Sequence, residues 1–277
     1  MAIVTLDPHQ HDDDHDDHGG LQRDLMTTVN RRSMLLTTAR LSAGLGMLQL
    51  FGCGSSNAPT DGTGNPNASC SRIPEETAGP FPGDGSNGAN VLNQSGVVRA
   101  DIRSSFAGLS GTAVGIPLTV QLTIVSATSC APLANYAVYL WHCDRAGLYS
   151  LYSSGVTNQN YLRGVQQADG AGQLSFTTIF PGCYAGRWPH IHFEVFRTLA
   201  AAGNFSNKIA TSQIALPKAS CDLVYDTTGY ASSKSNLANV TLASDNIFSD
   251  GSALELATVT GSVAAGFTAT LTVAVPV

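Results

Sequence analysis

The sequence predicts an all-β fold, a β-sandwich of mostly antiparallel strands joined by long loops. Several segments alternate apolar and polar residues with a period of two, the period of a strand that buries one face. Turn-forming pairs such as Asp84-Gly85, Asp169-Gly170 and Pro181-Gly182 stand between these segments. Gly, Ser, Thr and Ala are abundant, and no amphipathic pattern longer than a few helical turns is evident. These features together favour short strands over helices.

The first fifty residues have the pattern of an export signal. Arg31-Arg32 precedes the apolar stretch LSAGLGMLQLFGC, which is too short to cross a membrane as a mature helix. The pattern resembles a bacterial twin-arginine signal, so we predict that residues 1–53 direct export, to the periplasm or to a membrane anchor. LFGC resembles a lipoprotein cleavage box, which would leave a lipid anchor on Cys53. Cleavage at another site would instead remove that cysteine.

We assign residues 54–69, GSSNAPTDGTGNPNAS, to a flexible linker and residues 70–277 to one folded domain. This domain has no Cys-x-x-Cys pair, which argues against a zinc knuckle. In an oxidising compartment one or two disulfides are expected, with one thiol left over and the pairing open. The cysteines available are Cys70, Cys130, Cys143, Cys183 and Cys221.

The charge balance argues against a nucleic-acid partner. The chain has 14 Lys and Arg against 20 Asp and Glu, a formal net charge of −6. Charged residues make up 12% of the sequence, and no basic stripe is present that would neutralise a phosphate backbone. Nucleic acid is therefore not an expected partner.

Four segments predict strands, in chain order. Residues 117–125, PLTVQLTIV, place four aliphatic side chains on one face. Residues 136–143, YAVYLWHC, are rich in β-formers and end at a Cys-Asp turn. Residues 172–180 alternate in the same way, and residues 267–275 carry threonines on their second face.

A further strand is predicted over residues 190–196, HIHFEVF, directly after Pro189. His190, His192 and Glu194 share one face of this strand. Imidazoles two residues apart project in parallel, roughly 6.5–7 Å apart at the backbone, which suits two neighbouring ligands of one metal ion. Glu194 is a candidate for supporting such ligands from behind.

Histidines are scarce in the domain. Only His142, His190 and His192 follow the predicted linker. No histidine follows His192, as a cupin-type site would need, whereas His142 would complete a three-histidine zinc site of a hydrolase. If only the other two bind a metal, oxygen or sulfur donors must complete the site, and tyrosines are the first candidates.

Three segments resemble the intradiol aromatic-ring-cleaving dioxygenases, and the compact exported branch of that family above all. They are PEETAGPF (74–81), LWHCDRAGLYS (140–150) and YLRGVQQADGAGQLSFTTIFPGCYAGRWPHIHFEVF (161–196). The combined pattern is a Gly-x-Tyr after a strand end, a Pro-Gly-x-Tyr, and then Arg-x-x-His-x-His. The resemblance runs from about Cys70 to Asp250.

The resemblance implies a non-haem iron(III) cofactor held by two tyrosinates and two histidines. In this sequence the metal ligands would be Tyr149, Tyr184, His190 and His192. Arg187, three residues before the first histidine, would stabilise negative charge that develops on the substrate ring. Gln213, in TSQIALP, matches a catalytic glutamine of the family more loosely. Thr77, Gly79 and Pro80 would lie near the substrate mouth.

The implied reaction inserts both atoms of O2 into a catechol-type ring and cleaves it between the two hydroxyl-bearing carbons, giving a muconate-type diacid. Ferric iron is a hard cation and phenolate is a hard anionic donor, which explains the two tyrosines. Because a free tyrosine has a pKa near 10, phenolate at neutral pH needs such a cation beside it. Tyr184 would leave the metal and take a proton when the catechol binds.

Other interpretations stay open. Tyr152 and Tyr161 lie close enough to Tyr149 in the sequence to be mistaken for the first tyrosine ligand. The main alternative function is a surface-tethered β-sandwich module that binds aromatic compounds or carbohydrate and holds a non-catalytic metal. Cys183 also departs from the family pattern, in which an apolar or aromatic residue precedes the second tyrosine.

Overall fold

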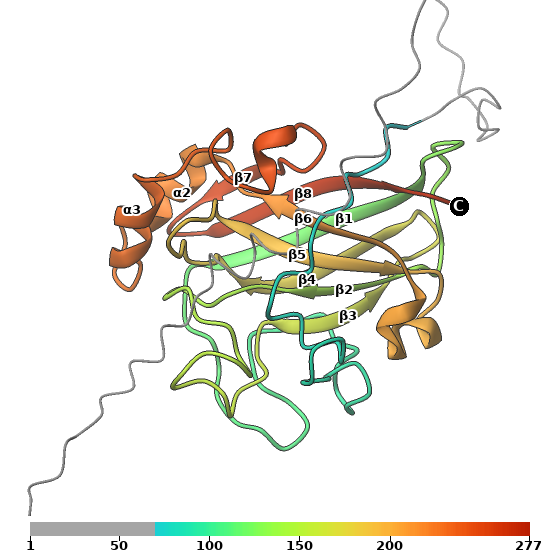
Figure 1. Cartoon of the computed structure of the whole chain (residues 1–277), viewed down its shortest axis with the longest axis horizontal. Coiled ribbons are helices and arrows are strands. Elements are labelled where there is room, and N and C mark those ends of the chain that lie inside the picture. Colours follow the sequence, from blue (N-terminus) through green and yellow to red (C-terminus); the bar gives the residue numbers. More distant parts are fainter. Residues whose placement is uncertain (1–69) are drawn as a thin grey trace, which may run out of the picture. The chain divides into compact units, whose positions relative to one another are not determined.

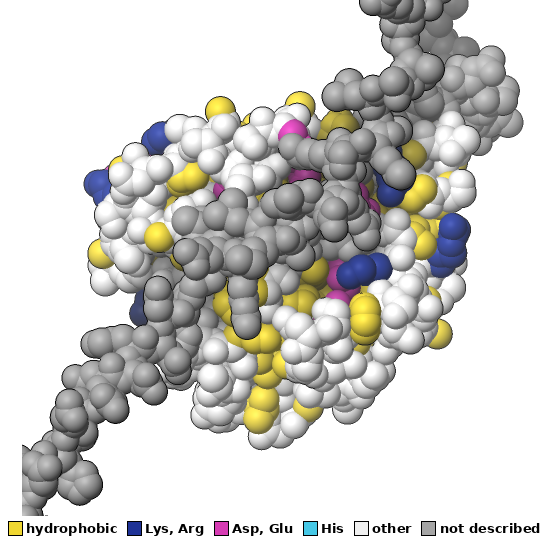
Figure 2. Space-filling model, viewed as in Figure 1, with side chains coloured by type: hydrophobic (Ala, Val, Ile, Leu, Met, Phe, Trp, Pro, Cys, Tyr) yellow, Lys and Arg dark blue, Asp and Glu magenta, His cyan; other side chains and the backbone are white. Residues whose placement is uncertain are grey.

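The computed structural model describes residues 70–277. The predictions for residues 1–69, which are the export signal, the lipid anchor at Cys53 and the linker, lie outside the described residues. Within residues 70–277, no helix has both the length and the hydropathy needed to cross a bilayer. Charged side chains stand singly and in small groups on the face shown in Figure 2.

Two four-stranded sheets form this part of the chain, with short helices in the connections (Figure 1). The strands are β1 (Pro117–Ser126), β2 (Ala137–Trp141), β3 (Arg163–Gln167), β4 (Gln173–Ile179), β5 (His190–Phe196), β6 (Lys208–Ala215), β7 (Thr258–Ser262) and β8 (Gly266–Val275). The helices are α2 (Lys218–Tyr225) and α3 (Ala231–Leu237), with 3-10 turns η2 (Ala200–Gly203), η3 (Phe205–Asn207) and η4 (Phe248–Asp250). In Figure 1, α2 and α3 lie together at one end of the strands.

The pairing of the strands confirms the predicted fold class. The strand order is β4-β1-β8-β7 in one sheet and β3-β2-β5-β6 in the other. All pairs of these strands are antiparallel except β1 and β8, which run parallel. The domain is thus an all-β sandwich of mostly antiparallel strands with long loops, as the alternating pattern predicts.

The main hydrophobic core lies between the two sheets. The apolar faces predicted for β1 and β5 meet there, and each of their core side chains is at most 1% exposed: Leu118, Val120, Leu122, Ile191, Phe193 and Val195. Burial of one such side chain stabilises the fold by about 1.5–3 kcal/mol. This core fixes the direction of β5, so the histidines of β5 must point to the opposite face.

The opposite face of the β3-β2-β5-β6 sheet is buried under loops. A second apolar cluster on this face joins Tyr139 and Trp141 of β2 to Tyr149 and Phe81 of the loops. All seven residues of β5 are consequently buried, the polar ones included. The covering loops run through residues 77–115 and 142–162, below β3 in Figure 1. The polar face of β5 therefore lies in an enclosed environment of low dielectric constant.

Arg163 of β3 holds these covering loops together. Its guanidinium is 1% exposed and donates hydrogen bonds to the carbonyl oxygens of Phe81, Pro82 and Ser150, at 3.0, 2.7 and 2.9 Å. Charge-assisted bonds of this kind satisfy a buried cation. Two loops that lie far apart in the sequence thus share one anchor on the sheet.

The sequence pattern does not predict β3 or β7. β3 reads RGVQQ, in which a glycine and polar residues hide the alternation. β7 reads TVTGS and is a mostly exposed edge strand. Their pairing partners, β2 and β8, are strongly patterned and supply the ladder hydrogen bonds that hold them. Tertiary pairing overrides weak local propensity here.

One disulfide joins Cys70 to Cys130 across 60 residues of sequence. It ties the start of the described chain to the turn between β1 and β2. Cys143, Cys183 and Cys221 are free and buried. The expectation of a single leftover thiol is therefore wrong, because these three side chains pack as small apolar groups inside the hydrophobic clusters.

Candidate metal centre

Strand β5 brings His190 and His192 onto the loop-covered face of the sheet. His192 lies opposite Trp141 of β2 and opposite Gln213 of β6. The rings of Trp141 and His192 stack, with centroids 4.9 Å apart and planes inclined by 5°. The sheet thus fixes the orientation of this imidazole.

Tyr149 reaches the histidines from the loop that follows β2. Asp144 stabilises the turn in this loop. Its carboxylate accepts hydrogen bonds from the backbone N–H groups two and four residues further on, at 2.8 and 3.0 Å. Gly147 has a φ of +84°, and a Cβ at this position would lie 3.1 Å from the Cβ of Tyr184. A glycine at this turn therefore lets the two tyrosine segments approach each other.

Tyr184 lies between β4 and β5 on a segment that helix α3 holds. Ser233 Oγ accepts a hydrogen bond from the backbone N–H of Cys183 at 2.9 Å, and Asn236 donates to the Cys183 carbonyl at 2.8 Å. Tyr184 is half-buried, and the two residues after it are exposed, whereas Tyr149 is buried. The site therefore opens toward solvent on the Tyr184 side.

The four predicted ligand side chains converge. Nε2 of His190 lies 3.1 Å from Nε2 of His192, 3.2 Å from Oη of Tyr184 and 3.4 Å from Oη of Tyr149. Donor atoms that sit side by side at about 2 Å from a shared ion are roughly 3 Å apart. These separations are those of neighbouring ligands on one cation.

Hydrogen bonding leaves a free lone pair on His190. Its Nδ1 lies 2.5 Å from the carbonyl oxygen of Trp188, and a carbonyl can only accept, so this nitrogen carries the proton. Nε2 consequently faces the convergence point with a lone pair. A backbone carbonyl on the second ring nitrogen is the usual support of a metal-binding histidine.

The electrostatics of the site fit a bound cation. Burial raises the pKa of Tyr149 well above 10, and the charge of Tyr184 raises it further. Burial also lowers the pKa of both histidines well below the ordinary value. Without a cation the phenol of Tyr149 is therefore protonated and both imidazoles are neutral. Phenolate is a hard anionic donor that suits ferric iron, and imidazole also binds iron, so these residues fit the implied cofactor.

A three-histidine zinc site does not fit the geometry. Nδ1 and Nε2 of His142 each lie 2.7 Å from another group, the carbonyl of Cys143 and the hydroxyl of Thr178. Among residues 70–277, no group of three or more His, Cys, Asp or Glu side chains is placed to hold a metal. A metal ion held by the histidine pair of β5 would therefore need other donors, such as phenol oxygens, to complete its coordination.

The two other candidate tyrosines are engaged elsewhere. The hydroxyl of Tyr152 accepts from the backbone N–H of Gly83 at 2.9 Å and donates to Asn87 at 2.8 Å. The hydroxyl of Tyr161 donates to the Asp144 carboxylate at 3.1 Å. Of these three tyrosines, Tyr149 is the one whose hydroxyl contacts a histidine of β5.

Arg187 and Gln213 lie together beside the ligands. The guanidinium is 2% exposed, and its Nη2 donates to Oε1 of Gln213 at 2.7 Å. The Gln213 amide in turn donates to the carbonyl of Thr77 at 3.0 Å. Burial alone would lower the pKa of Arg187, but the negative charges of Tyr184 and Asp245 raise it above its ordinary value, so the group stays cationic.

The segment predicted to form the substrate mouth lies against His192. A Cβ on Gly79 would stand 3.4 Å from Cε1 of that imidazole, and Gly79 has a φ of +68°. Its backbone N–H donates to the hydroxyl of Thr77 at 3.0 Å. Thr77, Gly79 and the adjoining Pro80 therefore form a close cover over one edge of the site.

Glu194 and Cys183 do not join the ligand set. Oε1 of Glu194 accepts a hydrogen bond from Nζ of Lys208 at 2.7 Å, and burial raises the pKa of this carboxyl to about 7. Sγ of Cys183 lies 3.4 Å from the carbonyl of Arg187, and burial raises the pKa of this thiol to about 12. The carboxylate pairs with a lysine, and the thiol is an inert packing group.

Sequence reasoning missed Asp245. Its carboxylate is fully buried and accepts hydrogen bonds from Nε of Arg187 at 2.9 Å and from the backbone N–H of Trp188 at 2.6 Å. Asp245 lies 58 residues after Arg187 in an irregular loop. No local motif marks such a partner.

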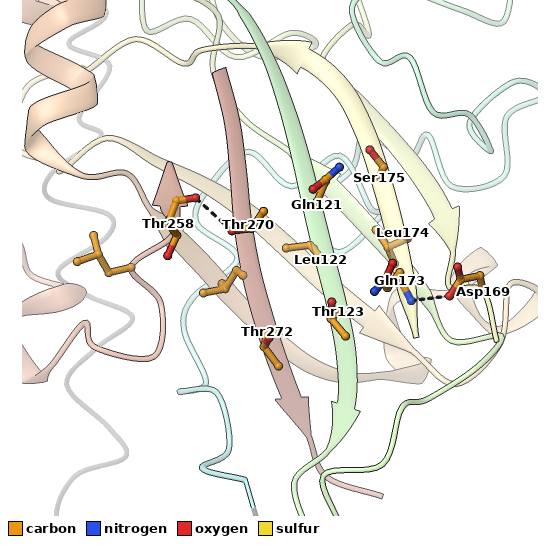
Figure 3. A pocket seen from close by; sticks show the side chains of 12 residues that line it. Gln121, Leu122, Thr123, Asp169, Gln173, Leu174, Ser175, Thr258, Thr270 and Thr272 are labelled. Atoms are coloured by element: carbon orange, nitrogen blue, oxygen red, sulfur yellow. Dashed lines mark hydrogen bonds between the residues drawn. The ribbon is translucent and has the colours of Figure 1, made fainter. Parts of the chain in front are cut away.

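A groove of about 670 Å³ lies on the outer face of the other sheet. Figure 3 shows Gln121 and Thr123 of β1, Thr270 and Thr272 of β8 and Asp169 along it. The residues that line this groove include none of the predicted ligands. The two faces are separated by the sandwich core, so the groove and the ligand cluster are distinct features.

Comparisons with known proteins bear on the same residues. Residues 99–201, which include both tyrosines and both histidines of the cluster, match a family model described as Dioxygenase. The fold also matches the intradiol ring-cleavage dioxygenase of Tetranychus urticae, with a TM-score of 0.60 and 24% identity, over 75% of this chain and 95% of that chain. The chain thus matches a dioxygenase model over part of its length and shares the fold of an intradiol ring-cleavage dioxygenase. The predicted resemblance and enzyme class are confirmed at this level.

A second solved structure similar to this chain is the dioxygenase domain of a dioxygenase carbohydrate-binding protein fusion from Streptomyces sp. SirexAA-E. It shares 20% identity with a TM-score of 0.48, over 75% of this chain and 99% of that chain. No curated protein matches the chain. The family model indicates a dioxygenase over residues 99–201, and the Tetranychus urticae structure shows the fold.

Proposed function

We propose that this protein is a non-haem iron(III) intradiol dioxygenase that cleaves a catechol-type ring between its two hydroxyl-bearing carbons. Both atoms of O2 enter the product, a muconate-type diacid. The observation that carries the proposal is the convergence of three donor atoms on Nε2 of His190. Nε2 of His192 lies 3.1 Å from it, and the phenol oxygens of Tyr184 and Tyr149 lie 3.2 and 3.4 Å from it. No observation favours the tethered binding module over this enzyme.

Tyr149, Tyr184, His190 and His192 would hold the iron. Bound ferric iron supplies a Lewis acid that draws electron density from a coordinated catecholate and makes the ring reactive toward O2. Tyr149 is buried and anchored by its loop, so it suits a permanent ligand. Tyr184 is half-buried on the open side, so its Oη suits a group that exchanges with substrate and accepts a catechol hydroxyl proton.

Arg187 would stabilise the negative charge that builds up on the ring. Its guanidinium is held in place before substrate binds, and a charge fixed in advance costs no reorganisation during the reaction. Gln213 orients that guanidinium through the 2.7 Å hydrogen bond. The enclosed setting of the site strengthens this interaction, since the effective dielectric constant is low.

Oxygen uptake with a panel of diphenols tests the proposal. Purified protein loaded with iron(III) should consume one O2 for each catechol-type molecule cleaved. With 18O2, mass spectrometry should find two labelled oxygens in a diacid product. A single labelled oxygen, an aldehyde product or full activity with zinc in place of iron would contradict the proposal.

We also propose that the protein is exported, with a lipid on Cys53 as the specific form. The Cys70–Cys130 disulfide supports an oxidising compartment, since structural disulfides persist there. Mass spectrometry of the native mature protein tests this. An N-terminus at Cys53 carrying acyl groups supports the anchor, and a chain that retains residues 1–53 in the cytoplasm contradicts export.

A further inference from the structure

Asp245 receives four hydrogen bonds on one buried carboxylate. Oδ1 accepts from the backbone N–H groups of Ile247 and Phe248, at 2.8 and 3.1 Å. Oδ2 accepts from Nε of Arg187 at 2.9 Å and from the backbone N–H of Trp188 at 2.6 Å. A carboxylate offers about four lone-pair sites, so this one is fully used. One side chain thus joins the loop before η4 to the segment before β5.

These bonds decide where the guanidinium of Arg187 can lie. Asp245 holds Nε, and Gln213 holds Nη2 from another strand, so two acceptors on different atoms fix the plane of the group. Neither bond uses Nη1, which leaves donors free. A planar guanidinium that is held in this way presents its remaining donors in one direction.

The position of the guanidinium depends on its ion pair with Asp245. The ion pair with Asp245 is buried, with side-chain exposures of 2% and 0%. A buried cation that loses its partner tends to move toward water, so the position of Arg187 depends on this carboxylate.

Asp245 is also linked to His190 through hydrogen bonds to the backbone of Trp188. It accepts from the N–H of Trp188, and the carbonyl of Trp188 accepts from Nδ1 of His190. The ring of Phe248, whose N–H caps the same carboxylate, lies 6.5 Å from the ring of His190. The loop that carries Asp245 is therefore a wall of the site.

We propose that Asp245 is the positioning residue of this site, which fixes the guanidinium of Arg187 over the place where the substrate ring binds. This inference rests on the proposed ring-cleavage function. Asp245 acts through Arg187 and does not itself touch the metal ligands.

A double-mutant cycle tests the proposal in the iron-loaded enzyme. Asp245→Asn has one acceptor oxygen for four donors, so Arg187 should lose its fixed orientation. We expect kcat to fall by about 10- to 100-fold, with KM changed by less than about threefold. In an Arg187→Ala background, the same substitution should lower kcat by less than about threefold further, because the group through which it acts is gone.

The matched control is Asp169→Asn. Asp169 also accepts backbone hydrogen bonds, from Ala171 and Gln173 at a turn between β3 and β4, and it does not contact Arg187. This variant should keep wild-type kcat. Equal, multiplicative losses from Asp245→Asn in both backgrounds would overturn the proposal, since a general structural role predicts that result.

Two further measurements keep the proposal testable if Asp245→Asn folds poorly or if the wild type proves inactive. In Arg187→Ala, added guanidinium should restore more activity than added methylammonium. Asp245 and Gln213 still present two hydrogen-bond acceptors, which a planar guanidinium can bind at the same time. Equal rescue would contradict the proposal. A crystal structure of Asp245→Asn tests the proposal without any enzymatic activity. An Arg187 side chain that keeps its wild-type position, bonded to Gln213, would overturn the proposal even if no diphenol is a substrate.

Discussion

At the scale of single residues, the neighbours of His192 closely constrain the orientation of its ring. Trp141 stacks on one face of its ring at 4.9 Å, and Gly79 lies near its edge. Gln213 lies opposite on the neighbouring strand. The imidazole has little freedom to turn away from its partners. We expect such fixation wherever several ligands must meet at one ion.

Tyr184 gives the first prediction at this scale. Tyr184→Phe removes one phenolate and the proton acceptor proposed for catechol binding. The protein should keep most of its iron through the other three ligands, while the colour from phenolate-to-iron charge transfer changes. Turnover should fall by about 100-fold or more, in line with loss of a general base. Iron analysis, a visible spectrum and oxygen uptake check this.

Tyr152→Phe is the matched control, because Tyr152 bonds to Gly83 and Asn87 outside the cluster. It should leave both colour and rate near the wild-type values. A Tyr152→Phe variant that loses the colour, with Tyr184→Phe unaffected, would mean that the ligand assignment is wrong.

Glu255 gives a prediction on stability against pH. Its carboxyl is fully buried, one oxygen accepts from Ser212 and the other has no hydrogen-bond partner. Burial, with added repulsion from Glu76, raises its pKa to about 8. Because the folded pKa lies above the unfolded one, this group stabilises the fold fully below about pH 4.5, and the contribution is lost as pH rises through about 8.

Glu255→Gln should remove that dependence. Between pH 5.5 and pH 9 the wild type should lose about 3 kcal/mol of unfolding free energy more than the variant does. Urea unfolding at three pH values measures the difference. If unfolding free energy changes with pH in the same way for both proteins, ionising the Glu255 carboxyl does not destabilise the fold. That result would contradict the raised pKa.

Much of the proposed ligand set can be predicted from the sequence because it lies in local motifs. His190 and His192 share a strand, and Tyr184 and Arg187 precede them within a few residues. Asp245 could not be predicted, because its link to Arg187 spans 58 residues and depends on how an irregular loop returns to the sheet. Glu194 lies on the predicted face of β5, but its carboxylate accepts a hydrogen bond from Lys208 on the next strand.

At the scale of elements, the covering loops turn one face of a sheet into a site. Without residues 77–115 and 142–162, the outer face of β5 would be exposed, and its histidines would be hydrated and mobile. Arg163 anchors both loops through the carbonyls of Phe81, Pro82 and Ser150. No strand is predicted for residues 77–115 or 144–162, and where these segments fold depends on this long-range anchor.

Gly79 tests the role of the covering loop. Gly79→Ala forces a side chain onto a backbone with a φ of +68° and places its Cβ 3.4 Å from the His192 ring. We expect a stability loss of about 1–2 kcal/mol and a drop in turnover of about 10-fold. Denaturant unfolding and oxygen uptake measure the two effects.

Gly155→Ala is the matched control, since Gly155 has a φ of +86° and an added Cβ there meets nothing within 4 Å. It should share the stability loss and keep the rate. Equal rates for both variants would show that the cover over His192 does not shape the site.

At the scale of the whole domain, the sandwich follows from alternation, but the sheet order does not. β1 and β8 come from opposite ends of the described chain and pair in parallel. No local signal encodes that neighbour choice, because it is settled by packing between distant segments. The sequence therefore predicts strands and layers better than it predicts which strands touch.

The Cys70–Cys130 disulfide carries a prediction for the domain as a whole. It closes a loop of 60 residues, so replacing both cysteines by alanine should lower the unfolding free energy by about 2–4 kcal/mol. The iron spectrum at room temperature should stay unchanged, since neither cysteine contacts the ligand cluster. Denaturant midpoints that match the wild type would contradict this role.

The measurement that tests the central claim most directly is a visible spectrum of the purified mature protein, with metal analysis, before and after catechol is added without oxygen. An iron(III) centre held by the two tyrosines should give a coloured protein with one iron per chain and a phenolate-to-iron band that shifts when catechol binds. A colourless protein that iron(III) cannot restore, or a band that catechol does not move, would contradict the proposed iron centre.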